Sequence, residues 1–155
     1  MTDDSMETLR KRLVHWLLAV CAAHVLVGAL LPWLGGAALF DAYHDGIEAA
    51  FWPGGAPAGA RSLDAWWLAL FGPTVQLMAF WMAALVRLAD RLRQPQVWCW
   101  LLAGLLVWAP QDMLVSLRAG YWPHVWVDLA ALAAMLPPLY WLWRRDAAAM
   151  QAVRP

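Results

Sequence analysis

The chain has 155 residues, of which 63% are hydrophobic and 14% are charged, whereas an ordinary soluble domain is about 45–50% apolar and about 25% charged. This composition excludes a soluble globular domain and predicts a membrane protein. Eleven Lys and Arg residues balance eleven Asp and Glu residues, so the basic surplus that nucleic-acid binding requires is missing, and we expect no nucleic-acid partner. Cys21 and Cys99 lie singly in apolar runs, which disfavours a disulfide framework.

Four apolar segments are long enough to cross a hydrocarbon core, which takes about 20 helical residues. They are residues 13–34, 65–86, 97–117 and 122–143. The first run is about twice as long as the apolar region of a signal peptide, so we expect a retained helix. The sequence therefore predicts an all-α integral membrane protein, a four-helix bundle in a single transmembrane domain over residues 1–155.

Charge predicts the orientation of these helices. With both termini in the cytoplasm, nine basic residues lie on the inner side and only Arg61 and Arg118 on the outer side, as the positive-inside rule requires. The outer half then carries a formal charge of −4 and the inner half +4. Ten of the thirteen tryptophans fall at the predicted membrane boundaries, and Trp81 and Trp108 are expected at depth. The usage of Ala, Trp and Arg is typical of a bacterium, so we expect a multi-pass protein of the cell inner membrane.

The connections differ in length. Residues 87–96 and 118–121 form tight turns, which makes the last three helices antiparallel neighbours. The first outer loop is long. In residues 39–52 apolar residues recur at helical spacing, with acidic residues between them, so a short amphipathic helix is expected at the membrane surface. Four of its residues could ligate a metal ion, but we interpret them as the solvated side of that helix. They are Asp41, His44, Asp45 and Glu48.

Two aspartates carry the strongest functional signal. Asp112 precedes Gly120 by eight residues and Asp128 follows it by eight, so an antiparallel pair of helices turning at Gly120 places both carboxyl groups at about the same depth. Ionisable groups in a spanning helix are costly and need a partner or a function. The alternative is a static network in which the two aspartates share a proton, or pair with Arg118 and Arg61.

Polar and aromatic residues at helical spacing from these aspartates complete a predicted ligand site. Those at helical spacing are Trp108, Ser116, Tyr121 and His124, and Gln111 and Trp126 are added to the predicted site from the same two helices. His24 and Gln76 lie at similar depth on the first two helices and would form its floor, although a single interhelical hydrogen bond is the simpler role for Gln76. If the site is catalytic, Asp112, His124 and Asp128 are the candidates for acid and base.

The sequence predicts no metal ion and no cofactor. His24 and His124 lie at different depths, so a haem between them fits badly. An HExxH motif, a Walker loop and a GxSxG motif are all missing, so no established catalytic motif supports an enzyme.

The order of parts, together with the glutamine in the stretch TVQLMAF at 74–80, resembles the EXPERA group. That resemblance implies a cavity among the helices for sterols or amphiphilic amines, as in the sterol isomerases of the group.

Three functions remain open from the sequence. The first is binding of a small amphiphilic or cationic ligand in an outward-facing acidic cavity lined by tryptophan, with Asp112 and Asp128 as counter-charges. The second is a membrane-embedded enzyme, such as an isomerase of a lipid. The third is an accessory subunit of a larger membrane complex. Expected partners are accordingly the lipid bilayer, an amphiphilic or lipid ligand, and a membrane protein or a second copy of the chain.

Overall fold

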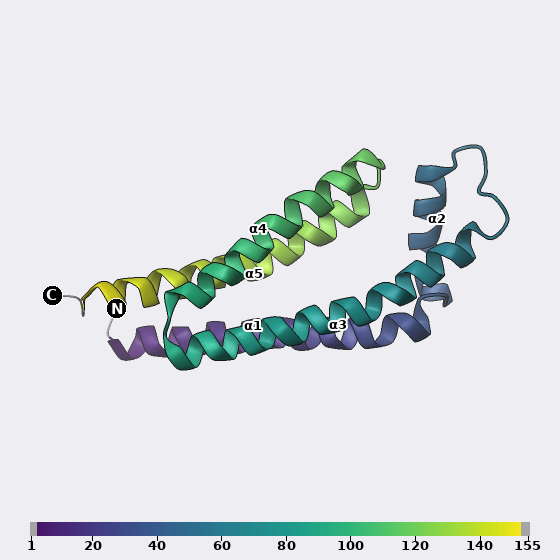
Figure 1. Ribbon diagram of the computed structural model, residues 1–155. Helices are drawn as coiled ribbons and strands as arrows, with labels where there is room; N and C mark the ends of the chain where they lie inside the picture. Colours follow the sequence, from purple (N-terminus) through teal and green to yellow (C-terminus); the bar gives the residue numbers. More distant parts are fainter. Residues whose placement is uncertain (1–2, 153–155) are drawn as a thin grey trace.

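The computed structural model describes residues 3–152, and this part of the chain is entirely helical apart from its connections (Figure 1). Its elements are α1 (Asp3–Leu34), the 3-10 turn η1 (Ala38–Phe40), α2 (Asp41–Phe51), α3 (Ala60–Leu92), α4 (Pro95–Arg118) and α5 (Trp122–Ala152). Four of these helices, α1, α3, α4 and α5, are long and apolar enough to cross a membrane. The predicted all-α fold with four spans is confirmed.

The spanning helices run beyond the apolar segments that predict them. α1 begins at Asp3, α3 extends from Ala60 to Leu92, and α5 continues to Ala152. Polar residues do not end a helix by themselves, because side chains that leave the hydrocarbon core remain solvated while the backbone ladder continues. The breaks come instead where the chain carries helix-stopping residues, at Gly35-Gly36, at Gln94-Pro95 and at Gly120, whose φ is +72°.

The four long helices pack as two antiparallel hairpins. Helix α3 lies along α1, and α5 lies along α4, whereas the contacts between the two hairpins are far fewer. The hairpins meet at the end where α1 begins and α5 ends, and they diverge toward the end that carries α2 (Figure 1). We call these the termini end and the α2 end. The last three helices were expected to be successive antiparallel neighbours, but α3 packs mainly against α1 and only weakly against α4.

The hydrophobic core lies between the hairpins toward the termini end. Ten buried side chains from all four helices form it: Val14, Leu17, Val86, Ala89, Trp98, Leu101, Leu105, Met135, Leu139 and Leu142. Trp98 is completely buried, although its position in the sequence suggested one more boundary tryptophan. The indole of Trp16 ties the hairpins together near this core, because its Nε1 donates to the carbonyl oxygen of Ala134 at 2.8 Å.

A buried ion pair closes the termini end of the core. The guanidinium of Arg10 on α1 has no exposed surface, and its Nη2 donates to Oδ2 of Asp146 on α5 at 3.1 Å. Arg10 also pairs with Asp90 on α3. Nε1 of Trp98 on α4 donates to the same Asp146 oxygen at 2.8 Å. The guanidinium of Arg10 and the carboxylate of Asp146, together with their partners Asp90 and Trp98, thereby join all four spanning helices.

Two glycines allow α1 and α3 to touch backbone to backbone. A Cβ atom added at Gly28 would lie 2.6 Å from the carbonyl oxygen of Gly72, and a Cβ at Gly72 would lie 2.6 Å from the carbonyl oxygen of Gly28. Small residues at such crossings let membrane helices approach closely, and packing then replaces the hydrophobic effect as the source of association. The long loop between α1 and α3 therefore does not prevent their pairing.

Helix α2 links the two hairpins at the α2 end. Arg61 on α3 pairs with Asp41, Asp45 and Glu48 on α2, and the Tyr121 hydroxyl at the start of α5 donates to the carbonyl oxygen of Tyr43 at 3.4 Å. The expected short helix is present, while its place at a membrane surface stays a prediction. The acidic residues of α2 bind an arginine of the chain, whereas His44, which was expected on the solvated side of this helix, is buried.

Candidate functional site

Three residues predicted to form the site lie together between α4 and α5. Asp112, His124 and Asp128, here called the acidic cluster, each offer one donor atom, and these atoms all lie within 4.8 Å of one another. The proximity follows from the antiparallel turn at Gly120, which brings positions eight residues away on either side to the same level. Helical spacing also matters: Asp112 stands seven residues after the core residue Leu105, and Asp128 seven before the core residue Met135. The cluster therefore continues the faces of α4 and α5 that form the core.

Asp128 is the unusual member of the acidic cluster. Its side chain is 1% exposed, and its Oδ2 atom is buried without a hydrogen-bond partner among the described residues. Buried carboxylate oxygens are normally paired, because an unpaired one loses its hydration with no compensation. Asp112 and His124 are partly exposed, so the cluster remains accessible from one side.

Within residues 3–152, neither aspartate of the cluster forms an ion pair with an arginine or lysine of the chain. Arg61, one of the two partners considered from the sequence, pairs with three carboxylates of α2 instead. The other, Arg118, lies on the exposed surface of α4 without an ion pair to either aspartate. The acidic cluster thus carries two carboxyl groups and no fixed cation.

Ser116 orients the imidazole of the cluster. Its side chain is buried, and its Oγ lies 3.0 Å from Nδ1 of His124 across the two helices. A hydrogen bond at Nδ1 holds the ring plane and leaves Nε2 for another partner. Ser116 is therefore a positioning residue for the cluster, as its place on the predicted stripe suggests.

Other predicted site residues lie elsewhere on α4 and α5. Trp108 and Trp126 are exposed, at 41% and 64%, so their indoles face outward on the helices. Gln111 is exposed, and its Nε2 donates to the carbonyl oxygen of Val107 in the same helix at 2.6 Å. Tyr121 is buried against α2, where its ring meets Tyr43 edge-on at 5.9 Å. The structure does not place these four residues at the acidic cluster, so their role in binding stays a prediction.

The proposed floor of the site lies on the other hairpin. His24 is exposed on α1, and its Nδ1 is 2.8 Å from the carbonyl oxygen of Val20 in its own helix. Gln76 lies at the crossing of α1 and α3. A Cβ atom added at Gly28 would meet the backbone nitrogen and the Cγ atom of Gln76, as well as the carbonyl oxygen of Gly72. Gln76 therefore takes part in helix packing.

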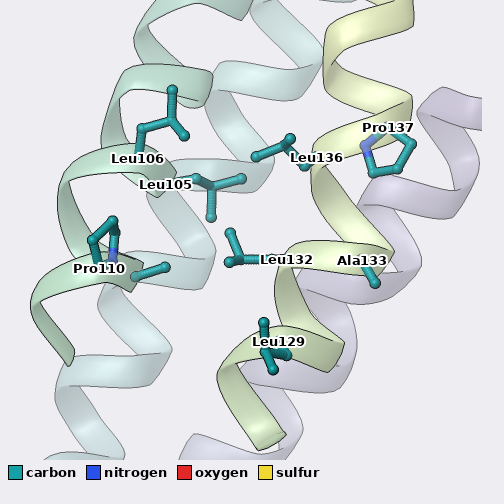
Figure 2. A pocket seen from close by; sticks show the side chains of 9 residues that line it. Leu105, Leu106, Pro110, Leu129, Leu132, Ala133, Leu136 and Pro137 are labelled. Carbon is teal, nitrogen blue, oxygen red and sulfur yellow. The ribbon is translucent and has the colours of Figure 1, made fainter. Parts of the chain in front are cut away.

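An apolar groove, which the sequence did not predict, lies beside the acidic cluster. It has a volume of about 400 Å³ between α4 and α5 (Figure 2). Nine apolar residues line it: Leu105, Leu106, Ala109, Pro110, Leu129, Leu132, Ala133, Leu136 and Pro137. Ala109 stands one turn before Asp112, and Leu132 one turn after Asp128, so the groove and the cluster are neighbours along the same helix pair. The expected tryptophans do not line it.

His44 on α2 forms a second buried polar site, outside the spanning helices. Its side chain is 1% exposed, with Nδ1 at 2.5 Å from Oδ2 of Asp64 on α3 and Nε2 at 2.7 Å from the carbonyl oxygen of Gly35. Both partners accept hydrogen bonds, so both ring nitrogens must carry a proton, and the ring is cationic. Burial alone lowers the pKa of His44, but the bonds to Asp64 and Gly35 outweigh it, and the pKa is raised above 6.5.

The attachment of α2 should depend on pH through His44. A raised pKa means that the bonds of the folded state are fully present below the ordinary pKa of 6.5 and are lost as the pH rises through the raised value. We expect the amide protons of residues 43–50 to exchange faster at alkaline pH, after correction for intrinsic exchange rates. His44→Gln should abolish this dependence. Corrected exchange rates that stay constant in the wild type across the same pH range would contradict it.

Comparison of the chain with family models, with curated proteins and with solved structures finds no match. The resemblance to the EXPERA group therefore gains no support, and function must be argued from the site itself.

Proposed function

We propose that this chain is a small multi-pass protein of the bacterial inner membrane that binds a cationic ligand at the acidic cluster. The observation that carries the proposal is the buried, unpartnered Oδ2 atom of Asp128 next to a second carboxyl group, with no arginine or lysine of the described chain to neutralise them. Two carboxylates in a poorly hydrated place repel each other, and a bound cation removes both the repulsion and the missing bond.

The charge distribution supports an approach from the outside. With both termini in the cytoplasm, as the excess of basic residues at the termini end favours, the acidic cluster and the carboxylates of α2 face the periplasmic half of the membrane. A negative outer half raises the local concentration of cations near the cluster. Asp112, which is partly exposed, then provides the first contact for a ligand.

A screen by thermal unfolding tests this proposal. The purified protein in detergent is heated with alkali ions, divalent metal ions or tetraphenylphosphonium. We expect at least one of these cations to raise the melting temperature, because a ligand at 100 times its Kd stabilises the folded state by about 2.7 kcal/mol. Asp112→Asn and Asp128→Asn should abolish the rise, whereas Asp41→Asn on α2 should keep it. A screen in which no cation stabilises the protein through these two aspartates would refute the proposal.

The apolar groove favours a more specific ligand, an amphiphilic cation with its charged group at the acidic cluster and its apolar part in the groove. Ala133→Trp fills the groove without touching the aspartates. We expect this variant to lose tetraphenylphosphonium binding, and Asp128→Asn to weaken it by about 1.5–3 kcal/mol through loss of a charge-assisted contact. Equal affinity in both variants and the wild type would exclude this ligand class.

A further inference from the structure

The donor atoms of the acidic cluster have the composition and spacing of a metal site. Two carboxylate oxygens and one imidazole nitrogen lie within 4.8 Å of one another. Ligand atoms of one tetrahedral zinc ion at about 2.0–2.2 Å lie about 3.3–3.6 Å apart. Asp112 and His124 are partly exposed, so rotation of their side chains can bring the donor atoms closer together.

The buried member of the cluster points to an ion independently of this spacing. Asp128 is 1% exposed and its Oδ2 has no hydrogen-bond partner in the described chain. A proton shared with Asp112 would satisfy one oxygen of the pair, whereas a divalent ion satisfies both carboxylates and cancels their two charges. No arginine or lysine of residues 3–152 forms an ion pair there.

Ser116 makes the imidazole a competent ligand. When Nδ1 of His124 carries the proton, it donates to Oγ of Ser116 across the 3.0 Å contact, and the lone pair of Nε2 is left for a ligand. Histidines that bind metals in proteins are held in this way by a hydrogen bond at the opposite ring nitrogen. Ser116 is buried on the neighbouring helix, so the ring is fixed relative to Asp112.

From these contacts we propose that Asp112, His124 and Asp128 bind a divalent transition-metal ion of the zinc type. This inference rests on the proposed cation binding and names the class of cation. An imidazole together with carboxylates suits Zn²⁺ and its neighbours, whereas Mg²⁺ and Ca²⁺ prefer oxygen ligands alone. Neither cysteine of the chain belongs to the cluster, which disfavours Cu⁺. Three protein ligands leave one position for water or an exchanging ligand.

Metal titration of the purified full-length protein, after removal of metals with EDTA, tests the inference. We expect one Zn²⁺ per chain, and one Co²⁺ with the strong visible absorption of tetrahedral Co²⁺, at concentrations at which Mg²⁺ does not compete. Asp112→Asn, Asp128→Asn and His124→Gln should abolish the Co²⁺ spectrum. Ser116→Ala should weaken metal affinity about 10–100-fold while leaving the ligands in place.

Matched variants separate the acidic cluster from other polar groups. His24→Gln removes an exposed histidine of another helix, and Asp41→Asn removes an acid of α2, so both should bind Co²⁺ as the wild type does. Within residues 3–152, Oδ2 of Asp128 has no hydrogen-bond partner that Asp128→Asn would remove, and the unfolding curve of this variant without metal should confirm that it folds.

Three outcomes would overturn the inference. If Zn²⁺ and Co²⁺ bind with equal affinity to the wild type and the three ligand variants, the ion lies elsewhere. If tetraphenylphosphonium or an alkali ion stabilises the protein through Asp112 and Asp128 while Zn²⁺ and Co²⁺ do not, the metal assignment fails and the proposed cation binding stands. If no cation of any class acts through the two aspartates, both fail.

Discussion

Replacing Arg10 by alanine is expected to lower the free energy of unfolding by about 3–5 kcal/mol, the usual cost of removing one partner of a buried ion pair. Arg10 is fully buried, and its Nε and Nη2 lie 3.4 and 3.1 Å from the two oxygens of Asp146. Without it, the indole of Trp98 is the one hydrogen-bond donor that Asp146 keeps among residues 3–152. The carboxylate would then have to take up a proton or draw water into the core.

Unfolding in mixed micelles with increasing SDS measures this loss. Lys11→Ala is the matched control, because Lys11 is the next residue, carries the same charge and is exposed. The double variant Arg10→Met, Asp146→Leu should recover much of the stability, since it removes both charges together. If Arg10→Ala and Lys11→Ala unfold at the same SDS concentration, the ion pair contributes nothing to the fold.

Replacing Gly28 by alanine is expected to destabilise the protein by about 1–3 kcal/mol, the range for overfilling a packed site. The new Cβ would lie 2.6 Å from the carbonyl oxygen of Gly72 and 2.9 Å from the backbone nitrogen of Gln76. These are backbone atoms, so no side chain can rotate away, and α1 and α3 would have to separate.

Gly104→Ala provides a control of opposite sign. Gly104 also lies inside a spanning helix, but a Cβ there meets nothing within 4 Å, so this variant should be neutral or gain up to about 1 kcal/mol from helix propensity. The same SDS titration compares the two. A Gly28→Ala protein as stable as Gly104→Ala would show that α1 and α3 do not approach as closely as the structure has them.

Part of the acidic cluster was predictable because it depends on local geometry alone. The equal spacing of Asp112 and Asp128 from Gly120 needs only a helical hairpin with a tight turn, and the structure brings the two residues together with His124. The tryptophan lining was not predictable, because helical spacing leaves the direction of a long side chain undetermined within a wide sector. Trp108 shares the stripe of Asp112 but remains exposed.

The positions of Arg10 and Asp146 in the sequence are those of core-facing residues. Arg10 continues the spacing of the buried residues Val14, Leu17 and Cys21, and Asp146 continues that of Leu139 and Leu142. Both therefore belong to core-facing stripes. The positive-inside rule, which counts Arg10 among the nine inner basic residues, does not consider which face of a helix bears a charge.

The sequence by itself determined the helical class, the four spans and the hairpin of α4 and α5, because hydrophobic length, helix-stopping residues and short turns act locally along the chain. Only the tertiary structure decided which helices pair. Helix α3 lies along α1 since Gly28 and Gly72 permit backbone contact across a long loop, and the hairpins join at the termini end because Arg10 and Asp146 can be buried only together. Each pairing depends on the shape and charge of two surfaces that lie far apart in the sequence. The residue pattern of one helix does not determine which other helix packs against it.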